Sequence, residues 1–115
     1  MSTQAFLKNY RVSPIKARLL ADQIRGKSVE EALTLLDLSS KRFARQLAKL
    51  VRSALANAEH KNEHKAAGID IDTLVVSKVL VDQGPNMWRI RARAQGRAAW
   101  LQKKTANVRV VLSEQ

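Results

Sequence analysis

The chain has 115 residues, which suits one domain with a modest core, and its 45% hydrophobic content excludes a disordered basic tail. Its 21 lysines and arginines outnumber 10 aspartates and glutamates, so the formal net charge is +11. Such a charge costs self-repulsion and indicates an anionic partner: a nucleic acid, an anionic membrane or an acidic protein. The chain has no cysteine, which excludes disulfides, thiolate metal sites and a cysteine nucleophile, and fits a reducing cytosol.

The N-terminal residues predict a short strand over residues 4–12. Its alternation predicts two faces, one with Ala5 and Leu7 and the opposite one with Phe6, Tyr10 and Val12. The N-terminus lacks the apolar run of a signal peptide, and no segment approaches 18 uninterrupted apolar residues. We therefore expect no membrane partner.

Two helices are predicted next. The first has Ser13 as its N-cap and Pro14 at its first position, and it ends at Gly26. The second begins with a capping box formed by Ser28 and Glu31. Apolar residues at helical spacing predict the buried stripes: Ala17, Leu20, Ala21 and Ile24 in the first helix, and Val29, Ala32, Leu33 and Leu36 in the second.

A third and longest helix is expected to start after Ser39 or Ser40 and to run to about Glu63. Its apolar residues keep helical spacing: Phe43, Leu47, Leu50, Val51, Ala54, Leu55 and Ala58. Cations repeat at steps of three and four on another face: Arg42, Arg45, Lys49 and Arg52. This basic face predicts phosphate contacts, and the alternative is a solvated face.

Two further strands complete the expected fold. Residues 74–82 form a β-branched run that Gly84–Pro85 ends, and residues 107–113 alternate with Val108, Val110 and Leu112 inward. Two strands that flank one insert predict an antiparallel pair whose connection extends into an arm. The expected fold class is α+β: a small antiparallel three-stranded sheet packed on three helices, with a long protruding β-hairpin arm. We expect a single domain over residues 1–115, with residues 84–105 as the arm.

The arm contains "NMWRIRARAQGRAAWLQKKT", residues 86–105, with six cations, two tryptophans and no acid. At period two, one face carries Trp88, Ile90, Ala92 and Ala94, and the other carries Arg89, Arg91 and Arg93. This favours a strand, although Arg89, Arg93 and Arg97 also align at period 3.6, so a helical turn stays open. Gln95–Gly96 is the expected turn, and about ten residues per side would reach roughly 30 Å.

The composition of the arm suits RNA. Arginine makes forked contacts to phosphate, and tryptophan stacks on bases, which contributes about 1–3 kcal/mol per base in single-stranded complexes. Cations interleaved with aromatic and small residues suit insertion between folded RNA elements. The alternative is a solvated hairpin whose tryptophans pack on the body.

The segment "HKNEH" fits the zinc-binding pattern H-x-x-E-H, with His60 and His64 as ligands and Glu63 as a base. Zinc would need a third protein ligand, and the chain has no other histidine. We favour a solvated helix end, or nucleic-acid contacts by Asn57, His60 and Lys61, over a zinc hydrolase. No phosphate-binding glycine motif appears, so we expect no catalytic residue, metal, cofactor or small-molecule substrate.

Five segments, in order, carry a resemblance over nearly all 115 residues: "RVSPIKARLLADQIRGKSVEEAL", "SALANAEH", "VDQGP", "RARAQGRA" and "KKTANVRVVLSE". They resemble the bacterial large-subunit ribosomal protein twenty-two family. The resemblance implies a cytoplasmic ribosomal protein that binds large-subunit rRNA, with its body near the exit of the peptide tunnel and its hairpin in the tunnel wall. It also implies neighbouring ribosomal proteins and the nascent peptide as partners.

The resemblance implies RNA-facing residues at matching positions: Ser13, Lys16, Arg18, Arg25, Gly26, Asn57, His60, Arg89, Arg93, Gly96, Arg97, Lys103, Lys104 and Thr105. The full expected RNA-binding set adds Arg11, Arg45, Lys49, Arg52, Lys61, Trp88 and Arg91.

The departures from the family lie mainly in the arm. Trp88 stands where the family usually has Lys, Ala92 where it has Pro, Gln95 where it often has a basic residue, and Ala99–Trp100 where it often has Asp-Arg. The connection "KNEHKAAG", residues 61–68, is longer than usual. A rival hypothesis is a free architectural DNA-binding protein with a basic β-arm. Such arms insert an apolar wedge between base steps, and the expected turn has none.

Overall fold

The computed structural model describes residues 2–65 and 68–114. Its elements, in order, are β1 (Ser2–Tyr10), α1 (Pro14–Ile24), α2 (Val29–Leu38), α3 (Arg42–Lys65), η1 (Ile71–Thr73), β2 (Leu74–Gln83), β3 (Met87–Ala92), η2 (Ala94–Gly96), β4 (Ala98–Lys103) and β5 (Ala106–Glu114). The connection predicted at residues 61–68 lies in part outside the described residues, because residues 66–67 are not among them.

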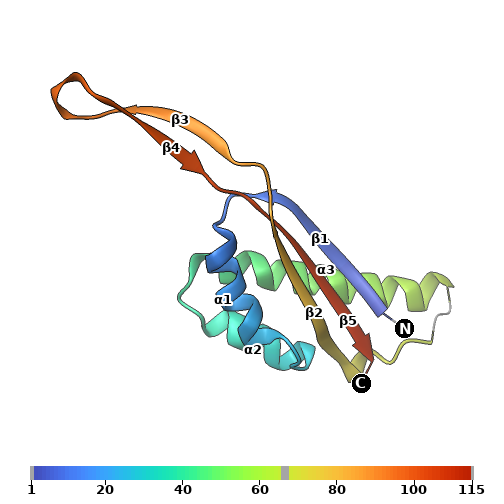
Figure 1. Ribbon diagram of the computed structural model, residues 1–115. Coiled ribbons are helices and arrows are strands. Elements are labelled where there is room, and N and C mark those ends of the chain that lie inside the picture. The colour runs from blue at the N-terminus through green and yellow to red at the C-terminus, as the bar shows by residue number, and fades with distance from the viewer. Residues whose placement is uncertain (1, 66–67, 115) are drawn as a thin grey trace.

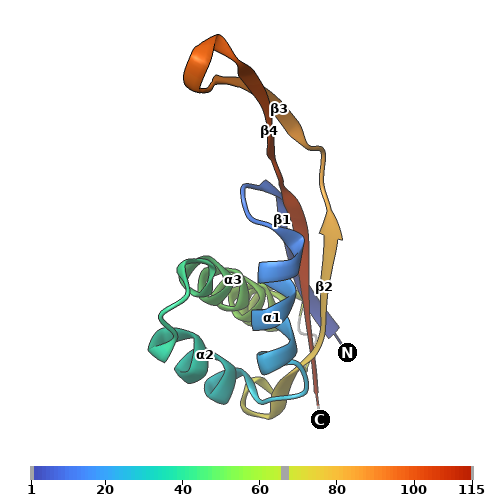
Figure 2. The same cartoon turned by 60° about the vertical axis from the view of Figure 1, so that its left-hand side comes forward.

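An antiparallel sheet with strand order β1-β5-β2 forms the body (Figure 1). In the register, Val110 of β5 pairs with Ala5 on one side and with Val79 on the other. The three helices lie on one side of this sheet (Figure 2). The predicted α+β class and the predicted antiparallel pairing of the strands that flank the arm are confirmed.

The core lies between the sheet and the helices. Val108, Val110 and Leu112 are completely buried, as their alternation predicted. The predicted stripes of the helices face them, and all their residues are buried except Leu33 and Leu55, which are partly buried against the core. At roughly 25 cal/mol per Å² of apolar surface removed from water, this core supplies the main force that holds the body together.

One predicted strand face is wrong. Tyr10 and Val12 pack against the core with Leu7, whereas Phe6 points to solvent on the opposite face. The reason is a register shift between Leu7 and Tyr10, where Asn9 adopts a left-handed φ of 54°. A bulge adds one residue to the strand, so every side chain beyond it changes face.

The turn between α1 and α2 fits its residues. Gly26 has a φ of +84°, which favours glycine, and its N–H donates to the carbonyl of Val76 at 2.8 Å. The Ser28 hydroxyl accepts from the Glu31 N–H at 3.3 Å, which is the serine half of the predicted capping box. Ser13 holds the N-cap position of α1, but its side chain makes no capping hydrogen bond.

The basic segment forms a two-stranded hairpin that projects from the sheet end of the body (Figures 1 and 2). Strands β3 and β4 pair from Met87 with Lys103 to Ala92 with Ala98, so the strand interpretation is confirmed over the helical one. The predicted turn is also confirmed, but two residues take left-handed angles there: Gln95 with a φ of 61° and Gly96 with a φ of 72°. The longest dimension of the molecule is 65 Å.

Candidate nucleic-acid interface

The two faces of the arm differ in chemistry. Ile90 pairs directly with Trp100, and Trp88 is the next residue on the same face. The side chains of Ile90, Trp100 and Trp88 are 64%, 68% and 57% exposed, so the alternative in which both tryptophans pack on the body is wrong. Arg89 and Arg91 occupy the other face. The arm therefore presents an apolar strip on one side and guanidinium groups on the other.

The cations of the arm are not neutralised within the described part of the chain. Ion pairs there involve only Arg25 with Asp22, Arg52 with Asp37, and His64 with Glu63. In the arm, the Arg89 guanidinium donates to the neighbouring Trp88 carbonyl at 3.3 Å. A fixed group of like charges without counter-charges attracts anions and repels itself.

The root of the arm is closed by Thr105. Its side chain is 3% exposed, and its hydroxyl donates to the carbonyl of Pro85 at 2.7 Å. The Gly84 N–H donates to the Thr105 carbonyl at 2.9 Å, and a Cβ on Gly84 would lie 2.5 Å from the Thr105 hydroxyl. This predicted RNA-binding residue therefore joins the two strands where the arm leaves the body.

Four predicted contact residues of the body also connect its elements. Arg18 donates to the carbonyl of Val81 at 3.1 Å, and Arg25 donates to that of Val79 at 2.8 Å, so both hold α1 on β2. Asn57 donates to the carbonyl of Gln4 at 2.8 Å, and Lys61 donates to that of Ser2 at 3.2 Å. These bonds to distant carbonyls are invisible in the sequence.

The basic face of α3 is exposed along its length, at Arg42, Arg45, Lys49 and Arg52. Arg52 approaches Asp37 of α2 to 3.3 Å in a pair that is about half exposed on both sides. Such exposed pairs contribute little to stability, so the Asp37 carboxylate offsets part of the local charge without fixing the fold.

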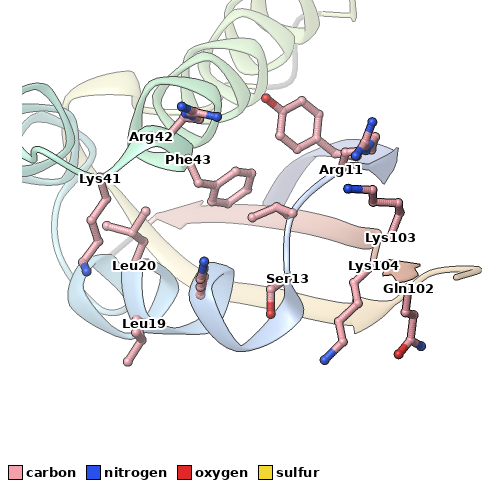
Figure 3. A pocket seen from close by; sticks show the side chains of 13 residues that line it. Arg11, Ser13, Leu19, Leu20, Lys41, Arg42, Phe43, Gln102, Lys103 and Lys104 are labelled. Atoms are coloured by element: carbon pink, nitrogen blue, oxygen red, sulfur yellow. The ribbon is translucent and has the colours of Figure 1, made fainter. Parts of the chain in front are cut away.

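A pocket of about 690 Å³ opens where the arm meets the body (Figure 3). It brings together residues that are far apart in the sequence. Its lining comes from the loop before α1, from α1, from the start of α3 and from the end of β4: Tyr10, Arg11, Val12, Ser13, Lys16, Leu19, Leu20, Lys41, Arg42, Phe43, Gln102, Lys103 and Lys104. Five of these belong to the predicted RNA-binding set and Arg42 to the predicted basic face, whereas the sequence assigned no binding role to Lys41, to Gln102 or to the apolar lining.

At the end of α3, the His60 and His64 rings lie with centroids 4.3 Å apart, and both side chains are exposed. His64 Nε2 lies 4.0 Å from a carboxylate oxygen of Glu63. Within residues 2–65 and 68–114, no group of three or more His, Cys, Asp or Glu side chains is placed to hold a metal ion. In the same residues, no helix combines the length and apolarity needed to cross a membrane.

The fold and the surface together define a small basic α+β protein with a cationic hairpin arm, a class suited to polyanionic partners. The family model for ribosomal protein L22p/L17e matches residues 5–113, and the chain belongs to this family. Two relatives are named large ribosomal subunit protein uL22. That of Desulforamulus reducens is 46% identical over 114 residues, which cover 99% of this chain and 96% of the relative. That of Desulfatibacillum aliphaticivorans is 45% identical over 114 residues, which cover 99% and 100%.

The predicted resemblance is thus confirmed. The family consists of structural ribosomal proteins, and the chain is not an enzyme.

Proposed function

We propose that this chain is a structural constituent of the large ribosomal subunit in the cytoplasm. It binds 23S rRNA, with its body near the exit of the nascent-peptide tunnel and its arm in the tunnel wall, and it supports subunit assembly and translation. The chain acts as one unit over residues 1–115, from which residues 84–105 extend. The observation that carries this proposal is the projecting hairpin, whose cations have no acidic partners in the described part of the chain.

The two faces of the arm support different contacts with RNA. The guanidinium groups of Arg89, Arg91, Arg93 and Arg97 bind phosphates, and each contact releases counterions. The exposed indole of Trp88 stacks on a base. Gly96 allows the tight turn that brings Arg93 and Arg97 together, where the Arg93 N–H donates to the Arg97 carbonyl at 2.6 Å.

The body contributes a second set of contacts. Arg45, Lys49 and Arg52 on α3 extend the basic surface, and Arg11, Ser13, Lys16, Lys103 and Lys104 lie around the arm root. Arg18, Arg25, Asn57, His60 and Lys61 complete the set. A guanidinium has five N–H donors, so the bonds that Arg18 and Arg25 make to β2 leave donors for phosphate. Thr105 is buried and contributes indirectly, because the hydrogen bond from its hydroxyl to the Pro85 carbonyl fixes the geometry of the arm root.

The two tryptophans of the arm and the surface of the body account for the remaining proposed contacts. Trp88 and Trp100 stand where the family usually or often has charged residues, and they expose a large apolar surface. In our proposal they stack on rRNA bases, and the nascent peptide passes the arm in the tunnel. Neighbouring large-subunit proteins contact the body.

Sedimentation of a cell extract tests the proposal against free DNA binding. The native protein should travel with large ribosomal subunits and remain there after DNase treatment, whereas RNase should release it. The rival hypothesis requires an apolar wedge at the tip, and residues 94–97 are Ala-Gln-Gly-Arg. Co-sedimentation with the nucleoid, abolished by DNase treatment, would overturn the proposal.

A further inference from the structure

We propose that the pocket at the arm root binds one unpaired nucleotide of RNA, with the flanking phosphates on its rim cations and the base against its apolar floor. The inference rests on the proposed function, to which it adds a nucleotide subsite at the arm root, distinct from the exposed strip of Trp88, Ile90 and Trp100. It depends on three features of the pocket: its charge, its floor and its uncommitted polar groups.

The rim of the pocket is a ring of cations. Lys41 and Arg42 lie on one side, and Arg11, Lys103 and Lys104 lie on the opposite side (Figure 3). Lys16 of α1 adds a sixth positive charge to the lining, and no acidic residue is part of it among the described residues. None of these six side chains forms an ion pair or a side-chain hydrogen bond in the regions that the structure describes. Six charges held together in this way fit two or more phosphates better than one isolated anion.

The floor of the pocket is apolar. Leu20 and Phe43 form its buried part, and Val12 and the half-exposed Leu19 form its wall. The Tyr10 ring packs at 5.7 Å from the Phe43 ring, so the strand bulge that turns Tyr10 inward also builds this wall. An apolar floor adds nothing to the binding of a phosphate alone. It does offer a surface against which the face of a nucleobase can pack.

Two polar side chains in the lining, Ser13 and Gln102, form no side-chain hydrogen bond in the part of the chain that the structure describes, and both can recognise a base edge. The Ser13 hydroxyl is half-buried and makes no capping hydrogen bond, although Ser at an N-cap ordinarily bonds to the second or third N–H of its helix. The Gln102 amide lies at the end of β4, next to the Lys104 side chain in Figure 3. Each can both donate and accept.

The size of the pocket agrees with an extruded nucleotide. Its volume of about 690 Å³ lies within the range of roughly 300–1,000 Å³ typical of small-ligand sites. A duplex would meet the rim cations with its backbone, but its stacked bases would not reach the floor. Sequence-specific recognition of RNA mostly uses unpaired bases that are splayed out of the helix.

Photocrosslinking of the full chain tests where the base lies. The probe is an oligouridylate of about eight nucleotides, which lies within the ~4–16-nucleotide site sizes of single-strand binders, with 4-thiouridine at each position. We expect crosslinks to residues 10–20 and to Phe43, in addition to crosslinks on Trp88 and Trp100 of the arm. The arm crosslinks are an internal control for RNA binding.

A double variant separates the pocket at the arm root from the exposed tryptophans of the arm. Lys16→Gln with Lys104→Gln should lower the crosslink yield at residues 10–20 by about tenfold or more, because losing even one of the two charged hydrogen bonds costs roughly a factor of ten. The yield at Trp88 should stay within about twofold of wild type. The matched control, Lys27→Gln with Lys78→Gln, removes the same charge from exposed positions outside the pocket and should change neither yield.

Three results would overturn the proposal that the pocket binds a nucleotide. Crosslinks confined to the arm would overturn the pocket proposal and leave the proposed function intact. An equal decrease of both crosslinks in the double variant and in its control would show a general charge effect and would also overturn it. Absence of any crosslink, with no binding to large-subunit rRNA, would overturn both proposals.

Discussion

Neutralising the four arginines of the arm should separate RNA affinity from stability. We consider the simultaneous change of Arg89, Arg91, Arg93 and Arg97 to Gln. All four side chains are exposed, and none forms an ion pair in the part of the chain that the structure describes. Within the same described residues, their one side-chain hydrogen bond joins Arg89 to the adjacent Trp88 carbonyl. Because exposed substitutions usually change stability by no more than about 0.5 kcal/mol each, four of them should change the free energy of unfolding by about 2 kcal/mol or less.

The effect on binding should be large and should depend on salt. For single strands, each phosphate that the protein neutralises contributes about 0.7 to the slope of log K against log salt, so removing four arginines should flatten the slope by up to about 3. Between about 50 and 200 mM salt, the affinity of the wild type should therefore fall roughly 50-fold further than that of the variant. The measurement is a salt titration of binding to a large-subunit rRNA fragment, with thermal unfolding of the same samples.

A charge-matched control makes the result specific to the arm. Changing Lys8, Lys27, Lys78 and Arg109 to Gln removes four exposed positive charges outside the proposed interface. That control should keep the wild-type slope, although removing Arg109, which lies 5.4 Å from the Phe6 ring, costs about 0.5–1 kcal/mol of stability. If the arm variant kept the wild-type slope, or if both variants flattened it equally, the arm would not be the phosphate-binding element.

Three further outcomes are expected. Leu47→Ala should lower the free energy of unfolding by about 2–5 kcal/mol in chemical denaturation, because Leu47 is completely buried; a change below about 1 kcal/mol would contradict this. Gly84→Ala should cost about 1–3 kcal/mol in calorimetry, since its Cβ would clash with the Thr105 hydroxyl, and unchanged stability would refute the proposed root. In hydrogen exchange of the free protein, residues 87–103 should lose protection well before residues 108–112, because an isolated two-stranded hairpin is marginally stable; equal protection would count against RNA-dependent ordering.

Much of the body follows from the sequence because local rules determine it. The buried stripe of α1 follows from the spacing of Ala17, Leu20 and Ile24, and the start of α2 follows from its Ser28 cap. The alternation of β5 identified its inward face, since one face of the sheet is covered. The acid-free composition of the arm predicted a basic extension, and the strand period predicted its hairpin.

Only the tertiary structure determined which residues of different elements contact one another. The bulge at Asn9 turned Tyr10 to the core side, against the alternation that the sequence predicts. Arg18 meets a carbonyl 63 residues away, and Thr105 meets one 20 residues away, so neither bond has a local signal. The pocket at the arm root combines side chains from Tyr10 to Lys104, and its ring of charge exists only because sheet pairing and helix packing bring three distant segments together. Sequence periodicity specifies which face of an element is buried, but the contacts between elements depend on how those faces are docked in space.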